Sequence, residues 1–70
     1  MMVWMDVLSS NISSISYCDQ TLFVQFKRGA VYRYFGVPAK QFEGLRAADS
    51  VGQYFCREIK GIYECERLTA

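Results

Sequence analysis

The stretch LFVQFKRGAVYRY, residues 22–34, constrains the fold more than any other part of the chain. Its first half alternates large apolar side chains with other residues at a period of two, which is typical of a β-strand with one better-buried face. Its second half repeats the alternation after Gly29. The two halves therefore predict an antiparallel hairpin whose turn is the sequence KRG.

The length of the turn decides which residues of the hairpin face each other. A two-residue loop would place Arg33 opposite Val24, on the apolar face. A three-residue loop, with Gly29 in the left-handed conformation that glycine adopts without steric cost, gives one wholly apolar face. Because a slip of one residue would reverse both faces, we predict the longer loop. Its cross-strand pairs are Phe26 with Ala30, Val24 with Tyr32 and Leu22 with Tyr34.

The flanking segments complete the predicted fold. The run SSISYC predicts a strand that turns back at Asp19-Gln20. A helix is expected after Pro38 and a second one after Ser50, which caps it. Gly61 ends the second helix, and IYECERL is a last strand or an extended tail. The predicted class is α+β: a small antiparallel sheet of three to four strands with two helices packed on one face, in the order β-β-β-α-α-β.

Composition limits the classes of function. The 70 residues predict a single domain, 1–70, in which residues 1–8 are an N-terminal extension or an edge strand. Eight basic and seven acidic residues give a net charge of +1, so no overall positive field attracts a polyanion. No apolar run approaches the roughly 20 residues of a membrane span, and the start lacks the basic region of a signal peptide. We expect a soluble cytoplasmic protein with no membrane partner.

The sequence offers few candidates for catalysis or metal binding. Cys18, Cys56 and Cys65 form no CxxC pair, and the chain has no histidine, so a zinc site would need three thiolates and an acid at unsuitable spacing. Cys56 has no histidine to act as its base. Glu64 and Glu66 merely share an exposed face of a strand. We expect free thiols, no metal, no cofactor and no catalytic residue, and therefore not an enzyme.

An ordered series of motifs resembles the KTSC domain, a short module found at the C-terminus of some lysyl-tRNA synthetases and as a stand-alone bacterial protein. The series comprises the Tyr-x-Tyr pair, the turn glycine, Val-Pro and the sequence S-x-G-x-Y-F, and the resemblance runs from about residue 8 to residue 68. Cys56 departs from it, since asparagine is expected there, and the first turn looks shortened. The resemblance implies RNA binding because of the synthetase context. The motif residues that we interpret as structural are Tyr32, Tyr34, Gly29, Pro38 and Phe55.

The tyrosine pair has two interpretations. Tyr32 and Tyr34 are either a platform on which bases stack, or core residues whose hydroxyls reach the edge of the core. The predicted register places both rings on the face of Leu22, Val24 and Phe26. We therefore predict that they are mostly buried.

The opposite face of the hairpin is the predicted binding surface. Phe23 lies opposite Arg33 there, with Phe35 further along the strand and with Lys27 and Arg28 at the turn. Two rings that flank a guanidinium, with cations nearby, suit a single-stranded nucleic acid. Alternatively, this face is covered by the segment MMVWMDVL, by a second copy of the chain or by another protein.

A further set of basic residues lies on or beside the two helices and is interpreted as a solvated surface, because acidic residues are interspersed with it. The set is Lys40, Arg46, Arg57 and Lys60. The predicted function is a non-enzymatic module that binds single-stranded nucleic acid, most readily RNA. The alternative is a protein-interaction module, either a homodimer or an inhibitor of a larger host protein, with no nucleic-acid binding.

Overall fold

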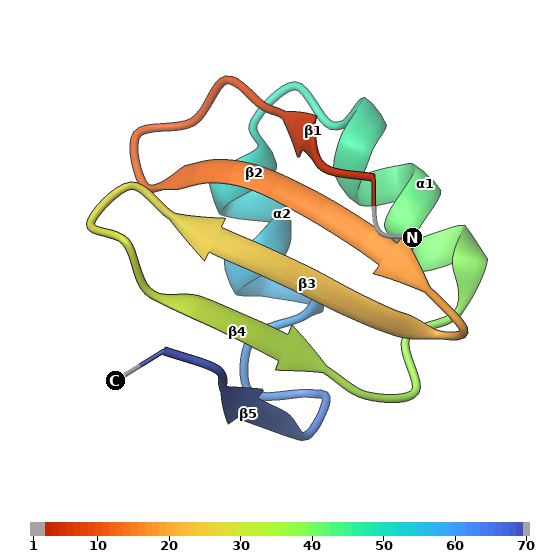
Figure 1. Cartoon of the computed structure of the whole chain (residues 1–70). Coiled ribbons are helices and arrows are strands. Elements are labelled where there is room, and N and C mark those ends of the chain that lie inside the picture. Colours follow the sequence, from red (N-terminus) through yellow and green to blue (C-terminus); the bar gives the residue numbers. More distant parts are fainter. Residues whose placement is uncertain (1–2, 70) are drawn as a thin grey trace.

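Two helices cover one face of a five-stranded antiparallel sheet in the computed structural model, which describes residues 3–69 (Figure 1). In chain order the elements are β1 (Met5–Asp6), β2 (Ile12–Cys18), β3 (Thr21–Phe26), β4 (Val31–Tyr34), α1 (Ala39–Ala47), α2 (Val51–Glu58) and β5 (Cys65–Arg67). The strands lie side by side in the same order as in the sequence. The predicted α+β class is confirmed, and the order of the elements differs from β-β-β-α-α-β by one additional strand at the start. The sheet has five strands because the N-terminal segment adds a two-residue strand at the edge beside β2.

The register predicted for the β3–β4 hairpin is confirmed. Val24 faces Tyr32, and Leu22 faces Tyr34. The Phe26 N–H donates to the Ala30 carbonyl across 2.8 Å, which closes the three-residue loop. Gly29 has a φ of +102°, the left-handed conformation that this loop requires.

The β2–β3 turn also has the predicted tip, but its backbone is unusual for its sequence. Asp19 and Gln20 form a two-residue loop with φ values of 49° and 62°. Two consecutive left-handed residues match the right-handed twist of the flanking strands, and asparagine and glycine are the residues that usually adopt this geometry. The Gln20 carbonyl accepts a hydrogen bond from the Val37 N–H at 2.8 Å. This bond ties the turn to the segment that leads into α1.

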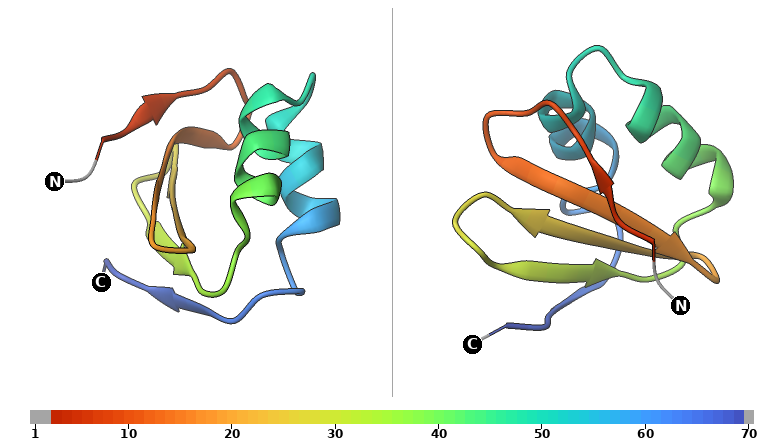
Figure 2. Two further views of the ribbon diagram at one scale, coloured as in Figure 1. Left: turned by 90° about the vertical axis from the view of Figure 1, so that its right-hand side faces the viewer. Right: turned by 45° about the horizontal axis from the view of Figure 1, so that its top comes forward.

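Both helices begin where the sequence predicts, and the glycine predicted to end the second helix follows it. α1 starts directly after Pro38, and the Gln53 N–H donates to Ser50 Oγ across 3.3 Å at the start of α2. Gly61, with a φ of +79°, follows the end of α2. Figure 2 shows the two helices on one side of the sheet and the segments that lead to the two chain ends on the other side. We call the face away from the helices the outer face.

The core lies between the sheet and the helices, and one of the two motif tyrosines is fully buried in it. The side chain of Tyr34 is 5% exposed, whereas Tyr32 is only half-buried. The prediction of burial is therefore confirmed for Tyr34 and partly for Tyr32. The buried core residues are Ile12, Ile15, Leu22, Val24, Tyr34, Val37, Leu45, Val51, Phe55 and Ile59.

Candidate nucleic-acid interface

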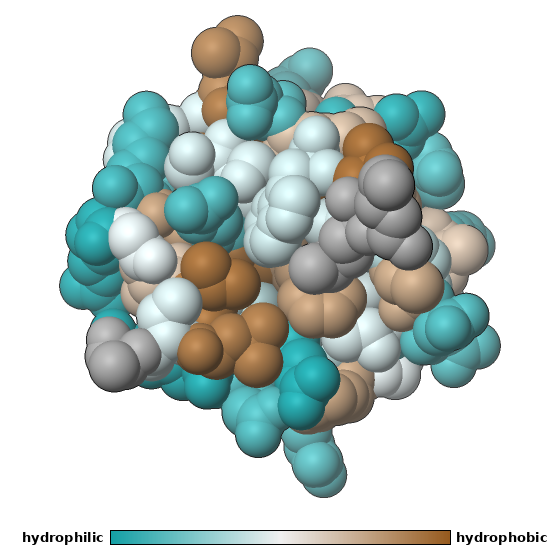
Figure 3. Space-filling model, viewed as in Figure 1, coloured by the Kyte–Doolittle hydropathy of each residue, from teal (hydrophilic) through white to brown (hydrophobic). Residues whose placement is uncertain are grey.

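The sequence-predicted patch lies on the outer face, and the register brings its central residues together. Phe23 on β3 and Arg33 on β4 are cross-strand partners. Lys27 and Arg28 are exposed at the turn beyond β3, and Phe35 is 40% exposed just after β4. Figure 3 shows apolar atoms gathered near the centre of this face, with hydrophilic atoms around them.

The positive charge of Arg33 is already paired. Its Nε donates to Glu66 Oε1 across 2.7 Å, and Glu66 is its cross-strand partner on β5. The guanidinium also lies 5.2 Å from the centre of the Phe35 ring, within the range of a cation–π contact. The predicted contact between arginine and an aromatic ring therefore exists. The carboxylate of Glu66, which the sequence analysis had not placed there, lies beside it.

The N-terminal segment covers part of the outer face. The Trp4 ring meets the Phe23 ring edge to face with centroids 6.4 Å apart. Ser16, which projects from β2 beside Phe23, donates to the Val3 carbonyl across 2.8 Å and is only 1% exposed. A serine on the outer face of the sheet would be exposed to solvent if no other part of the chain lay over it. The described part of the segment, from Val3 on, thus shields one end of the patch, and residues 1 and 2 lie outside the described residues.

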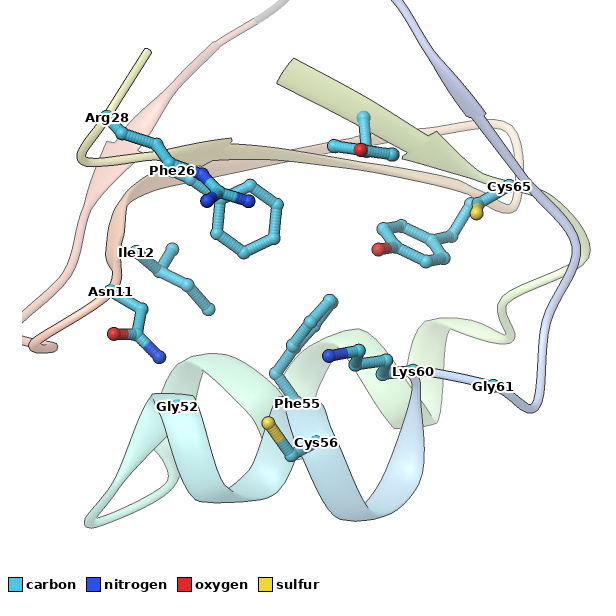
Figure 4. A pocket seen from close by; sticks show the side chains of 12 residues that line it. Asn11, Ile12, Phe26, Arg28, Gly52, Phe55, Cys56, Lys60, Gly61 and Cys65 are labelled. Carbon is cyan, nitrogen blue, oxygen red and sulfur yellow. The ribbon is translucent and has the colours of Figure 1, made fainter. Parts of the chain in front are cut away.

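A second candidate site lies on the helix side, where sequence reasoning had placed only core. A cavity of about 280 Å³ opens between the sheet and α2 (Figure 4). Four aromatic residues line it, and we call them the aromatic pocket: Phe26, Tyr32, Tyr34 and Phe55. Their rings form a closed series of contacts, with Phe26 meeting Tyr32 at 5.8 Å and Phe55 meeting Tyr34 at 5.4 Å. The remaining two contacts, between Phe26 and Phe55 and between the two tyrosines, close the series.

Three cations line this cavity or the hollow that adjoins it, and we call them the basic rim: Lys27, Arg28 and Lys60. Arg28 and Lys60 line the aromatic pocket itself, and all three line an adjoining hollow of about 380 Å³. The Lys27 N–H donates to the Asn11 carbonyl across 2.7 Å, which attaches the turn to the start of β2. No acidic residue lines either hollow, and within residues 3–69 none of the three cations forms an ion pair.

Lys60 was grouped by the sequence with the solvated surface beside the helices, and it is exposed there, but it also lines both hollows. Lys60 follows α2, so only the packing of that helix beneath the sheet brings it to the β3–β4 turn. The usable signal was its position directly before Gly61, where the chain leaves the helix and turns back toward the sheet.

The floor of the aromatic pocket is uncharged at neutral pH. Burial raises the pKa of Tyr34 to about 12, and the nearby Cys65, Tyr32 and Cys56 contribute in the same direction. The hydroxyl therefore stays protonated. Cys56 and Cys65 line the same cavity, while Cys18 lies at the end of β2, and all three thiols are free and exposed.

The described part of the chain offers no metal-binding cluster of three or more histidine, cysteine or acidic residues. A membrane-spanning helix is likewise absent from residues 3–69, because none of the helices there has the length and the apolar character to cross a bilayer.

The fold and these surfaces define a small α+β module, and comparison with known proteins identifies its family. The family model of the KTSC domain matches residues 8–63. The crystal structure of a KTSC domain protein from Yersinia pestis superimposes with a TM-score of 0.89 at 36% identity, over 99% of this chain and 100% of that one. This chain belongs to the KTSC domain family.

Two kinds of relative are found among curated proteins. A lysine–tRNA ligase of Trichormus variabilis is 48% identical over 50 residues, which are 71% of this chain but only 9% of the ligase. A protein of Stutzerimonas stutzeri is 41% identical over 54 residues, which cover 74% of this chain and 76% of that protein. The domain thus occurs both as a small part of a large enzyme and as most of a short chain.

Proposed function

We propose that this KTSC domain is a non-catalytic module that binds single-stranded RNA. The basic rim supports this proposal most strongly. Lys27, Arg28 and Lys60 come from distant parts of the chain, they form no ion pair within residues 3–69, and they surround hollows without an acidic lining residue. Such a cluster is the arrangement that contacts phosphates. We also propose a cytoplasmic location, where reducing conditions keep the exposed thiols free.

The local arrangement matters because the whole chain has a net charge of only +1. A charge of this size provides no long-range attraction, so the affinity must come from phosphates that contact the rim directly. Aromatic rings beside the rim favour a single strand, whose unpaired bases are free to stack. Each such stack contributes about 1–3 kcal/mol.

The outer-face patch is part of the same proposal. Lys27 and Arg28 belong both to this patch and to the basic rim, so a strand bound at the rim is able to continue across the turn onto the outer face. Phe35 is the more accessible of the two predicted stacking rings, because Trp4 contacts Phe23. Arg33 contributes less charge than the sequence suggested, since it is paired with Glu66.

The relatives support the choice of RNA as the ligand class. The names of the matched lysine–tRNA ligases state that those enzymes act on a tRNA, and the chain is 46–48% identical to three of them. The chain spans only 9% of each ligase, so the aminoacylation itself is not attributed to it.

The test is a titration of the purified protein with a fluorescent single-stranded RNA and with the duplex form of the same sequence. We expect saturable binding of the single strand and weaker binding of the duplex, whose bases cannot reach an aromatic ring. Binding should weaken as salt rises, because phosphate contacts release counterions. Equal or absent binding of both forms at low salt would contradict the proposal.

The outer face favours a second candidate function, which is contact with a protein. Trp4, Phe35 and Leu68 are 37%, 40% and 44% exposed, and the arginine among them is neutralised. Such a surface suits a second copy of the chain or a larger host protein. In that case Phe35→Ala should weaken the protein complex, salt should have little effect on it, and RNA should bind only weakly and without specificity.

A further inference from the structure

We propose that the aromatic pocket is a binding site for one nucleotide, whose base lies against Phe26 and Tyr32 and whose phosphate is held by Arg28 and Lys60. The proposal rests on the proposed RNA binding for its choice of ligand class. It adds a particular site on the helix side of the sheet, which shares Arg28 with the outer-face patch but not Phe23, Arg33 or Phe35.

The four rings of the aromatic pocket differ in burial: two form its floor and two form its walls. Phe55 and Tyr34 are 3% and 5% exposed, so they close the pocket on the inside. Phe26 and Tyr32 are half-buried, and their free surface lines the cavity. Phe26 and Tyr32 are nearly perpendicular to each other, with an interplanar angle of 87°. A planar ring that enters the cavity thus meets the face of one side chain and the edge of the other.

The charges around the pocket decide what kind of ring it accepts. Cages of aromatic side chains often bind cations, but here Arg28 and Lys60 belong to the lining and no acidic residue does. A cation would be repelled. A planar ring that carries a phosphate suits the aromatic walls and the two basic side chains together. Figure 4 shows Arg28 at the strand side of the cavity and Lys60 at the helix side.

The size of the pocket limits the ligand to a single unit. Its volume is about 280 Å³, whereas sites for drug-sized molecules begin at roughly 300 Å³. Asn11 also lines the cavity, and its side-chain amide offers both a donor and an acceptor to the edge of a base. One nucleotide of a strand therefore fits, and its neighbours would remain outside along the basic rim.

The three cysteines provide a direct test. Cys56 and Cys65 line the pocket and Cys18 does not, and all three are exposed. The experiment measures the rate at which N-ethylmaleimide labels each cysteine, using peptide mass spectrometry. The rate is measured for the protein alone and in the presence of one added ligand. The added ligands are each of the four ribonucleoside 5′-monophosphates, inorganic phosphate and a short single-stranded RNA. We expect a nucleotide present at ten times its Kd to slow the labelling of Cys56 by about tenfold. The rate at Cys18 should not change, and inorganic phosphate should not protect.

Two variants test the basic side chains in the same assay. Arg28→Gln should abolish the protection of Cys56 by a nucleotide. Lys40→Gln removes an exposed cation from α1 that does not line the pocket, so protection should persist. If Arg28→Gln leaves protection intact, the phosphate is not held as proposed and the inference fails.

The outcomes separate this inference from the proposed function. Protection by RNA, with or without protection by free nucleotides, supports the pocket as the site for a nucleotide of a strand. Protection by a free nucleotide without any RNA binding supports the pocket and overturns the proposed function. RNA binding without protection of Cys56 and Cys65 overturns the pocket and leaves the proposed function in place. Equal slowing of all three cysteines overturns the pocket, because it shows no local occupancy.

Discussion

Arg33 on β4 and Glu66 on β5 are cross-strand partners, and the arginine Nε donates to the carboxylate across 2.7 Å. This pair places an acidic residue in the middle of the surface that the sequence predicts as a cationic stacking platform. The basic rim, whose three cations form no ion pair in the described chain, lies instead at the β3–β4 turn and after α2. The pairing of β5 with β4 therefore reduces the positive charge of the outer face at Arg33.

The pair itself should contribute little to stability. Arg33 and Glu66 are 39% and 52% exposed, and exposed ion pairs contribute about 0–1 kcal/mol. Glu66→Gln should lower the free energy of unfolding in urea by less than about 1 kcal/mol. Glu58→Gln, which breaks the exposed pair with Arg57, is the matched control. A much larger loss for Glu66→Gln alone would mean that the pair organises β5.

The β2–β3 turn should gain stability from glycine. Gln20 has a φ of 62°, and the left-handed conformation costs a residue with a side chain about 1–2 kcal/mol. Glycine avoids this cost, but its greater flexibility in the unfolded chain offsets part of the gain. Gln20→Gly should therefore stabilise the domain by about 0.5–1 kcal/mol in urea unfolding. Gly29→Ala should act in the opposite sense, since Gly29 has a φ of +102°. Two changes of the same sign would contradict these backbone assignments.

Gly44 should resist a substitution that helix propensity favours. Alanine is better than glycine inside a helix by about 1 kcal/mol. A Cβ at this position would lie 2.9 Å from Tyr54 Cζ, and the Tyr54 hydroxyl is held by a 2.6 Å hydrogen bond to Gln41 Oε1. Gly44→Ala should thus destabilise the domain, by about 1–3 kcal/mol.

The double variant identifies the cause of this destabilisation. In a Tyr54→Leu background the ring is gone, so Gly44→Ala should become neutral or stabilising in urea unfolding. If alanine is equally harmful in both backgrounds, Tyr54 is not the reason for the glycine.

Tyr34 should make the domain less stable at high pH. An unfolded tyrosine ionises near pH 10.0, whereas burial raises the pKa of Tyr34 in the folded chain to about 12. The contribution of Tyr34 to the free energy of unfolding is complete below pH 10.0. It is lost as the pH rises toward 12, because the unfolded state releases a proton that the folded state retains. The free energy of unfolding should therefore fall over this range. Tyr34→Phe should show a shallower fall, and an identical slope would contradict the assignment.

The hairpin and the helices were predictable because their signals are local. Alternation from Leu22 to Tyr34 and one glycine at the turn leave a single register with a wholly apolar face, and Ser50 and Gly61 mark the ends of α2. Each of these features depends on residues close together in the sequence.

The features that were missed depend on distant packing. Lys60 joins the basic rim only because α2 lies beneath the sheet, and the sequence shows no relation between it and Arg28. Gly44 on α1 lies against the Tyr54 ring of α2, a contact that only the packing of the two helices reveals. For residues 1–8 the sequence left open an extension or an edge strand, and it offered this segment as one cover of the outer face; only the packed chain shows that β1 pairs with β2 and that Trp4 contacts Phe23.

The central claim is that the basic rim binds the phosphates of a single-stranded RNA, and the salt dependence of binding for two lysine variants tests it most directly. If all three rim cations contact phosphates, log K should fall with log salt with a slope of about −2, since each contact on a single strand contributes about −0.7. Lys60→Gln should weaken binding and reduce the magnitude of the slope by about 0.7, whereas Lys40→Gln, an equal loss of charge on α1, should leave the slope unchanged. Equal effects of the two variants, or binding that salt does not affect, would contradict the claim.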